Sequence, residues 1–361
     1  MSEPVAWGLA EKVAVRVAGT EPLARSYHYT SLGPDFEELT AEAEELVFQE
    51  IGFRSLRGPA RAQVVDRADW VRANIGSMRR LLRPLTERLS KGLNGPLAIP
   101  ASTLSAVEVG TMLGWMATRV LGQYDALLFE EESEDAAGDV VYYVGPNVLA
   151  LEKRFGFPPR EFRLWLALHE VTHRVQFTGV PWMHDYFRSL IDSTVNIADI
   201  DPKRFLDALR RSVDAVRAGR NPLDEGGLVA LLAGPEQFET LQKTQGLMSL
   251  LEGHGDVTMD RAGRDRIPSA ARFSATLHER RSARQPAVAK FVQQLVGLDA
   301  KMKQYEAGER FIEAVESVGG PSLLARAWEG PEMLPTLGEI REPATWIRRV
   351  SDIAPNLALA K

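Results

Sequence analysis

Apolar residues recur at the spacing of an α-helix through most of this chain, and only one stretch has the pattern of a buried β-strand. That stretch is VVYYV, residues 140–144. Residues 102–129 are apolar on nearly all sides, which predicts a buried helix, and Gly110 and Gly114 would let it pack closely against a neighbour. We therefore expect a mainly α-helical fold with a small β element.

The length of 361 residues allows one large or two modest domains. The order of helical segments, turns and loops predicts an N-terminal helical region at 1–125. A central region follows at 126–285, with a helical insertion at about 181–235, and a C-terminal helical region occupies 286–361. The alternative is that all three pack as one compact unit.

Composition excludes several classes of function. The chain has no cysteine, so disulfides, thiolate metal clusters and a cysteine nucleophile are absent. The net charge of −6 and basic segments without interleaved aromatic residues argue against a nucleic-acid partner. No run of about 18 apolar residues occurs, and the N-terminus lacks the pattern of a signal peptide. We therefore expect no membrane partner and a cytoplasmic location.

LALHEVTHRVQF, residues 166–177, places His169 and His173 four positions apart, on one face of the predicted helix. Two imidazoles at this spacing can bind one zinc ion, and Glu170 beside them can take a proton from a water that the metal activates. The alternative is a core helix that carries two histidines by chance. Because burying two histidines and a glutamate among apolar residues is costly without a partner, we favour the metal site.

A hydrolytic zinc site needs a third protein ligand, and the segment at 246–260 is its expected source. We predict that Glu252 is this ligand, with His254 as the alternative. Asp256 shares a helix face with Glu252 and is expected to orient the ring of His169 or His173 by accepting a hydrogen bond from its outer nitrogen. These residues could instead form a capped or solvent-facing helix end. Nitrogen and carboxylate ligands also accept Mn²⁺ or Fe²⁺ in place of zinc.

With these residues the sequence resembles the gluzincin type of zincin, in which one helix carries HExxH and a second carries Glu-x-x-x-Asp. It is more closely similar to an uncharacterised, largely actinobacterial family of zincin-like metallopeptidases, often labelled as associated with biosynthesis of a deazaflavin cofactor. LHEVTHRVQFTGVPW and LMSLLEGHGDVTMDR carry this resemblance. The resemblance implies a zincin-like core within a larger helical protein and a peptide or protein substrate. It also implies an edge strand that pairs with the substrate, for which VVYYV is the candidate.

A peptidase also needs a donor for the developing oxyanion, and the candidates are Tyr143, His278 and Tyr305. For each of them, taken singly, the alternative that we favour is a structural role. Two functions remain. The first is a zinc-dependent hydrolase, most simply a metallopeptidase with Glu170 as general base. The second is a catalytically silent scaffold or regulatory protein that binds zinc or a peptide. The intact Glu170 favours the first, because a silent site has no chemical need for it.

Overall fold

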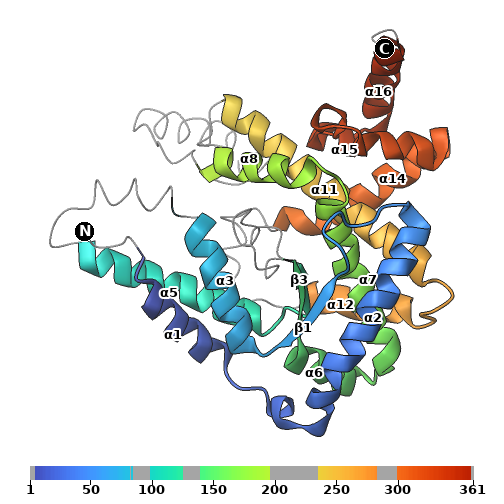
Figure 1. The fold of residues 1–361 in the computed structure, drawn as a ribbon. Helices are drawn as coiled ribbons and strands as arrows, with labels where there is room; N and C mark the ends of the chain where they lie inside the picture. Colours follow the sequence, from blue (N-terminus) through green and yellow to red (C-terminus); the bar gives the residue numbers. More distant parts are fainter. Residues whose placement is uncertain are drawn as a thin grey trace. The chain divides into compact units, whose positions relative to one another are not determined.

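The computed structural model describes residues 5–81, 83, 98–124, 139–195, 235–282 and 299–358 (Figure 1). The chain divides into two compact units. The first unit comprises Met1–Pro181 and Thr258–Ala283, and the second comprises Trp182–Val257 and Arg284–Lys361. This division does not test the three regions expected from sequence, which stay a prediction. The described residues are mainly helical with a three-stranded sheet, so the predicted fold class is confirmed.

The first unit holds the sheet and most of the long helices. Its elements are α1 (Trp7–Ala18), η1 (Pro22–Arg25), α2 (Tyr27–Ile51), β1 (Arg61–Val65), α3 (Arg67–Leu81), α5 (Ala98–Ala117), β2 (Gly122–Tyr124), β3 (Val140–Val144), α6 (Gly145–Phe155), α7 (Pro159–Thr178) and α12 (Ala270–Ser282). Helix α7 packs along α2 (Figure 1). Most side chains of α7 are buried in the core of this unit.

The sheet has the order β1-β3-β2, with β1 parallel to β3 and β2 antiparallel to it. VVYYV is a strand, as expected. However, β3 lies at the centre and pairs on both sides, so the prediction that its edge receives a substrate is wrong. Strand β2 lies at an edge of the described sheet. Its residues belong to the later part of 102–129, which was predicted to form one helix. That helix instead ends at Ala117, and the chain turns into β2.

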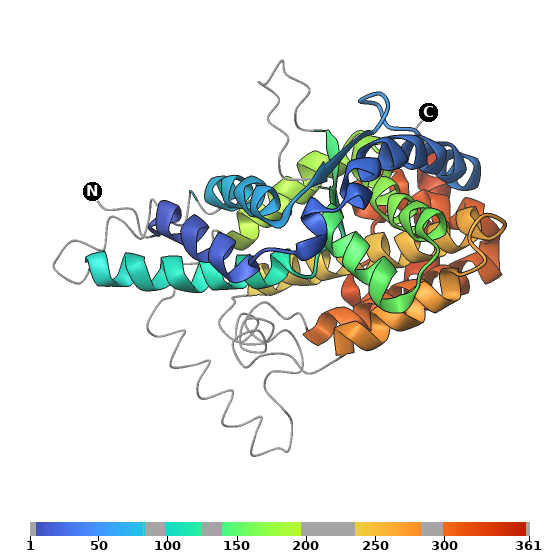
Figure 2. The ribbon, with the colours of Figure 1, turned by 90° about the horizontal axis from the view of Figure 1, so that it is seen from below.

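Helices α1 and α5 lie side by side (Figure 2) and contact each other through the two expected glycines. A Cβ atom at Gly110 would lie 2.5 Å from the carbonyl oxygen of Ala10, and one at Gly114 would lie 2.4 Å from that of Ala14. The predicted close packing is therefore confirmed. The burial of α5 is incomplete, because Leu104 is 61% exposed. Among the residues that the structure describes, no helix combines the length and apolar character needed to cross a membrane.

The second unit is helical in its described part. It contains α8 (Met183–Val195), α14 (Asp299–Ala325), η4 (Arg326–Trp328), η5 (Pro331–Met333), α15 (Leu337–Arg341), α16 (Pro343–Ala358) and most of α11 (Pro235–Gly263), whose last turns belong to the first unit. The expected insertion at 181–235 includes α8, and its residues 196–234 lie outside the described part.

Helix α11 runs unbroken through Gly253, although glycine weakens a helix. The reason for a glycine at this position is the close approach of α14. A Cβ atom at Gly253 would lie 2.4 Å from the carbonyl carbon of Gly308 on α14, and one at Gly308 would lie 2.1 Å from the carbonyl oxygen of Ser249. The backbones of α11 and α14 thus meet directly, next to Glu252.

Candidate metal centre

Helix α7 presents His169 and His173 from the same face, as their spacing predicted. Both are half-buried, and their ring centroids lie 4.6 Å apart at an interplanar angle of 87°. The indole of Trp165, one turn earlier, lies nearly parallel to the His169 ring, with 6.5 Å between centroids. The two imidazoles are therefore held by packing on the helix that carries them.

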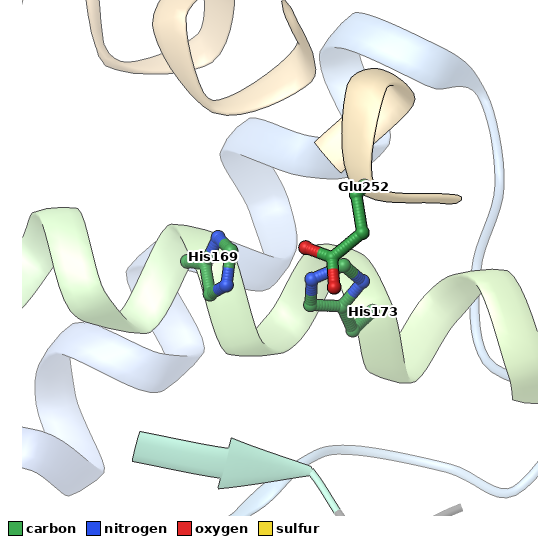
Figure 3. A group of neighbouring side chains, drawn as sticks. All are labelled: His169, His173 and Glu252. Atoms are coloured by element: carbon green, nitrogen blue, oxygen red, sulfur yellow. The ribbon is translucent and has the colours of Figure 1, made fainter. Parts of the chain in front are cut away.

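Glu252 on α11 completes a group of three possible ligands. One atom from each of His169, His173 and Glu252 can be chosen so that all three lie within 4.8 Å of one another. Figure 3 shows the Glu252 carboxylate directed toward the His173 ring. Zinc binds imidazole nitrogen and carboxylate oxygen at about 2.0–2.2 Å, so ligands of one ion lie about 3–4 Å apart. Two imidazole nitrogens and one carboxylate oxygen within this limit form a group that could hold one metal ion.

Gln176 is a residue near the histidines that the sequence interpretation missed. Its side chain is fully buried, and its Oε1 lies 2.9 Å from Nδ1 of His173. Because an amide oxygen only accepts, Nδ1 of His173 carries the proton, and Nε2 has the lone pair that a metal needs. The spacing of three residues along a helix could have indicated this contact.

We predict that Gln176→Leu weakens zinc binding about 10–100-fold, the usual effect of removing a hydrogen-bond partner of a histidine ligand. Gln176→Glu is the matched control, because a carboxylate also accepts from Nδ1. Competition with a zinc chelator measures both affinities. Equal affinities for the leucine and glutamate variants would show that the contact does not influence the metal.

Glu170 is 7% exposed and reaches the sheet. The backbone N–H of Tyr124 on β2 donates to its Oε2 over 3.0 Å. Gly122 has no side chain beside this carboxylate; a Cβ atom there would lie 2.6 Å from Oε1 of Glu170. The glutamate of the histidine helix therefore rests on the strand at the edge of the sheet.

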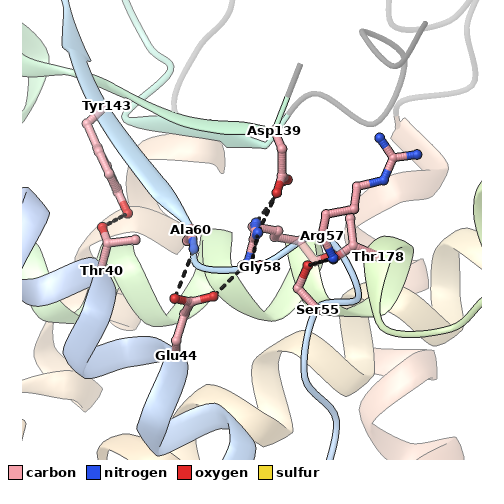
Figure 4. Close-up of polar contacts among 10 residues, drawn as sticks. Thr40, Glu44, Ser55, Arg57, Gly58, Ala60, Asp139, Tyr143 and Thr178 are labelled. Atoms are coloured by element: carbon pink, nitrogen blue, oxygen red, sulfur yellow. Dashed lines mark hydrogen bonds and ion pairs between the residues drawn. The ribbon is translucent and has the colours of Figure 1, made fainter. Parts of the chain in front are cut away.

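Arg174, next to His173, is completely buried and fixes α7 to three other segments. Its guanidinium donates to Glu44 of α2 over 2.6 Å, to the carbonyl oxygen of Gly58 over 2.7 Å, and to Asp139 just before β3. Figure 4 shows Glu44, Gly58 and Asp139 converging on this contact. Two carboxylates compensate the buried cation, as such a charge requires.

Tyr143 does not lie where a donor for the oxyanion was expected. Its ring is stacked on Phe36 in the core at 3.8 Å, and its hydroxyl is hydrogen-bonded to Thr40 over 2.8 Å (Figure 4). Burial raises the pKa of Tyr143, which keeps the phenol neutral. The structure thus gives its hydroxyl a partner in the core, and its role as an oxyanion donor stays a prediction. The side chains of the other candidates, His278 and Tyr305, lie outside the described part.

His254, the alternative ligand, and Asp256, predicted to orient a histidine ring, lie on α11 with Glu252. His254 is 5% exposed, and its ring meets the Trp328 ring edge-on at 4.9 Å. Among the described residues, the group that could hold a metal contains Glu252 and not His254. Asp256 is half-buried one turn after Glu252, and its contact with a histidine stays a prediction.

Comparison with known proteins extends these observations. Residues 5–347 match the family model described as zincin-like metallopeptidase. The chain belongs to this family. None of the curated proteins matches the zincin-like chain. Neither this match nor the structural comparison refers to the deazaflavin label, and that narrower resemblance stays a prediction.

The zincin-like chain is also similar to a solved structure. That structure is a protein from Chloroflexus aurantiacus, described as a candidate hydrolase with a novel fold. The two sequences are 31% identical, the TM-score is 0.71, and the match covers 96% of this chain and 99% of the other. Family and structural neighbour together support a zinc-dependent hydrolase, which agrees with the two imidazoles and the carboxylate.

Proposed function

We propose that this protein is a zinc-dependent peptidase, with the metal held by His169, His173 and Glu252 and with Glu170 as general base. The observation that carries the proposal is the group of three ligand atoms within 4.8 Å of one another, two of them from the helix that also bears the buried Glu170. Two imidazoles and one carboxylate are the ligand set of hydrolytic zinc sites that keep a position open for water or substrate.

Bound zinc would polarise the scissile carbonyl and lower the pKa of a water molecule to near neutrality. The residues of the chain supply the other parts of the reaction. Glu170 accepts the proton of the attacking water and passes it to the nitrogen of the leaving amine. Gln176 keeps the proton of His173 on Nδ1, so that Nε2 stays a ligand.

The edge of β2 is the proposed place for an extended substrate. Among the described strands, β2 pairs only with β3, so we propose that an extended substrate aligns along its other side. Tyr124 and Gly122 of this strand contact or border Glu170. A peptide on this edge would therefore bring a backbone carbonyl close to the base, which supports a peptide over a small amide as substrate.

The proposal is tested with the full-length protein. Elemental mass spectrometry gives the metal content, and a mixture of peptides incubated with the protein is analysed for new termini. We expect about one zinc per chain. We also expect cleavage that chelation stops and added zinc restores. Bound zinc without cleavage of any peptide would favour the silent scaffold, and a protein that binds no added metal would refute the zinc peptidase and the zinc-binding scaffold.

A further inference from the structure

The orientation of β2 follows from its hydrogen bonds to β3. The Val144 N–H donates to the carbonyl oxygen of Leu121 over 2.8 Å, so Leu121 faces β3. Residues of an antiparallel strand alternate between facing the partner strand and facing away from it. Gly122 and Tyr124 therefore turn their backbone groups away from β3, and the bond from the Tyr124 N–H to Glu170 agrees with this.

Gly122 has no conformational reason to be glycine. Its φ angle is not among the positive values that favour glycine in this chain. The reason is space, because a Cβ atom there would lie 2.6 Å from Oε1, 2.7 Å from Cγ and 2.8 Å from Cδ of Glu170. The missing side chain leaves the volume that the glutamate occupies.

We infer that Gly122 and the backbone amide of Tyr124 are positioning groups that seat Glu170 for proton transfer. This inference rests on the proposed function. The amide binds Oε2, and the space at Gly122 admits the rest of the carboxylate, so the side chain is held in one orientation. One carboxylate oxygen is then used for positioning, and the other can accept the proton of the attacking water.

The variants Gly122→Ala and Gly122→Val test, through kinetics, whether the space at Gly122 positions Glu170. Each added side chain must displace the Glu170 carboxylate, and a misplacement of about 1 Å can cost about 100-fold in rate. We expect kcat to fall about 100-fold for the alanine variant, with KM changed less than about twofold and zinc content unchanged. Gly76→Ala on α3 is the matched control, since no atom lies within 4 Å of its added Cβ. A merely structural role would instead lower stability and leave kcat unchanged.

The Tyr124 amide gives a second readout that does not depend on turnover. The chain has seven tyrosines, so selective ¹⁵N-tyrosine labelling yields a simple amide spectrum. We expect the Tyr124 amide proton to move upfield in both Glu170→Ala and Gly122→Val, because each change removes the hydrogen bond to a carboxylate. Gly76→Ala should leave it in place. If Gly122→Val does not fold, Glu170→Ala still reports on the same bond.

The two readouts separate this inference from the proposed function. An unchanged kcat in folded Gly122→Ala would overturn the inference even if the wild type is an active peptidase. A Tyr124 resonance that is insensitive to Glu170→Ala would overturn it whatever the activity. A wild type that cleaves no peptide but shows the expected amide shifts would refute the peptidase and confirm that Glu170 is seated on β2.

Discussion

Glu170→Gln is expected to retain one zinc per chain and to lose about 10²–10⁴-fold in kcat, the usual contribution of a general base. The amide side chain has nearly the same size as the carboxylate and can still accept from the Tyr124 N–H, but it cannot take a proton. The kinetic effect should therefore appear without loss of the metal. Parallel measurement of kcat and zinc content tests both parts.

The matched control for this variant is Glu37→Gln, which makes the same carboxylate-to-amide replacement at an exposed position on α2. It should behave as the wild type. If Glu170→Gln hydrolyses substrate at the wild-type rate, Glu170 is not the general base. That result would not test the proposed metal ligands. Loss of zinc in this variant would instead mean that Glu170 supports the metal.

Glu252→Ala is expected to weaken zinc binding by more than the roughly 10–100-fold caused by loss of a hydrogen-bond partner of a histidine ligand, because a direct ligand is removed. Alanine leaves two imidazoles, which hold zinc less tightly than the full set of three ligands. The backbone contact of Gly253 with Gly308 does not involve this side chain, so α11 should keep its packing. Zinc affinity by chelator competition, with circular dichroism as a check of folding, measures the effect.

His254→Ala is the comparison that separates the two candidates for the third ligand. In the structure His254 packs on Trp328 and lies outside the group of three possible ligands, so its loss should leave zinc binding close to that of the wild type. The reverse result, with zinc retained by Glu252→Ala and lost by His254→Ala, would assign the third ligand to His254.

The histidine pair and Glu252 could be predicted because each depends on local chemistry. A spacing of four residues on a helix brings His169 and His173 to one face in any helical context. An acidic residue in an otherwise apolar helix has a cost that a metal can offset, which made Glu252 conspicuous. Their approach to one another, by contrast, depends on tertiary packing, which no local pattern shows; it was inferred from the need of a hydrolytic zinc site for a third ligand.

The surroundings of Glu170 could not be predicted, for two physical reasons. β2 is only three residues long and follows an apolar helix, so its sequence has no period-two pattern and was interpreted as the end of that helix. Strand β3 is buried on both faces, at Val141 and Tyr143 as well as at Val140 and Val144. The sequence therefore shows no alternation of apolar and polar residues that could have revealed that Tyr143 faces the core. Which strand lies at the edge is a property of the whole sheet.

The buried contacts of Arg174 have a consequence for how the protein acquires its metal. Many small zinc domains are unfolded until the ion binds, so that folding and metal uptake are one event. Here the residue next to His173 is joined to Glu44, Gly58 and Asp139 by contacts in which a metal has no part. The imidazole pair is therefore expected to keep its spacing in the apoprotein. Such a chain binds zinc when it is already folded. Its folding therefore does not depend on the zinc supply, and the two can be regulated separately.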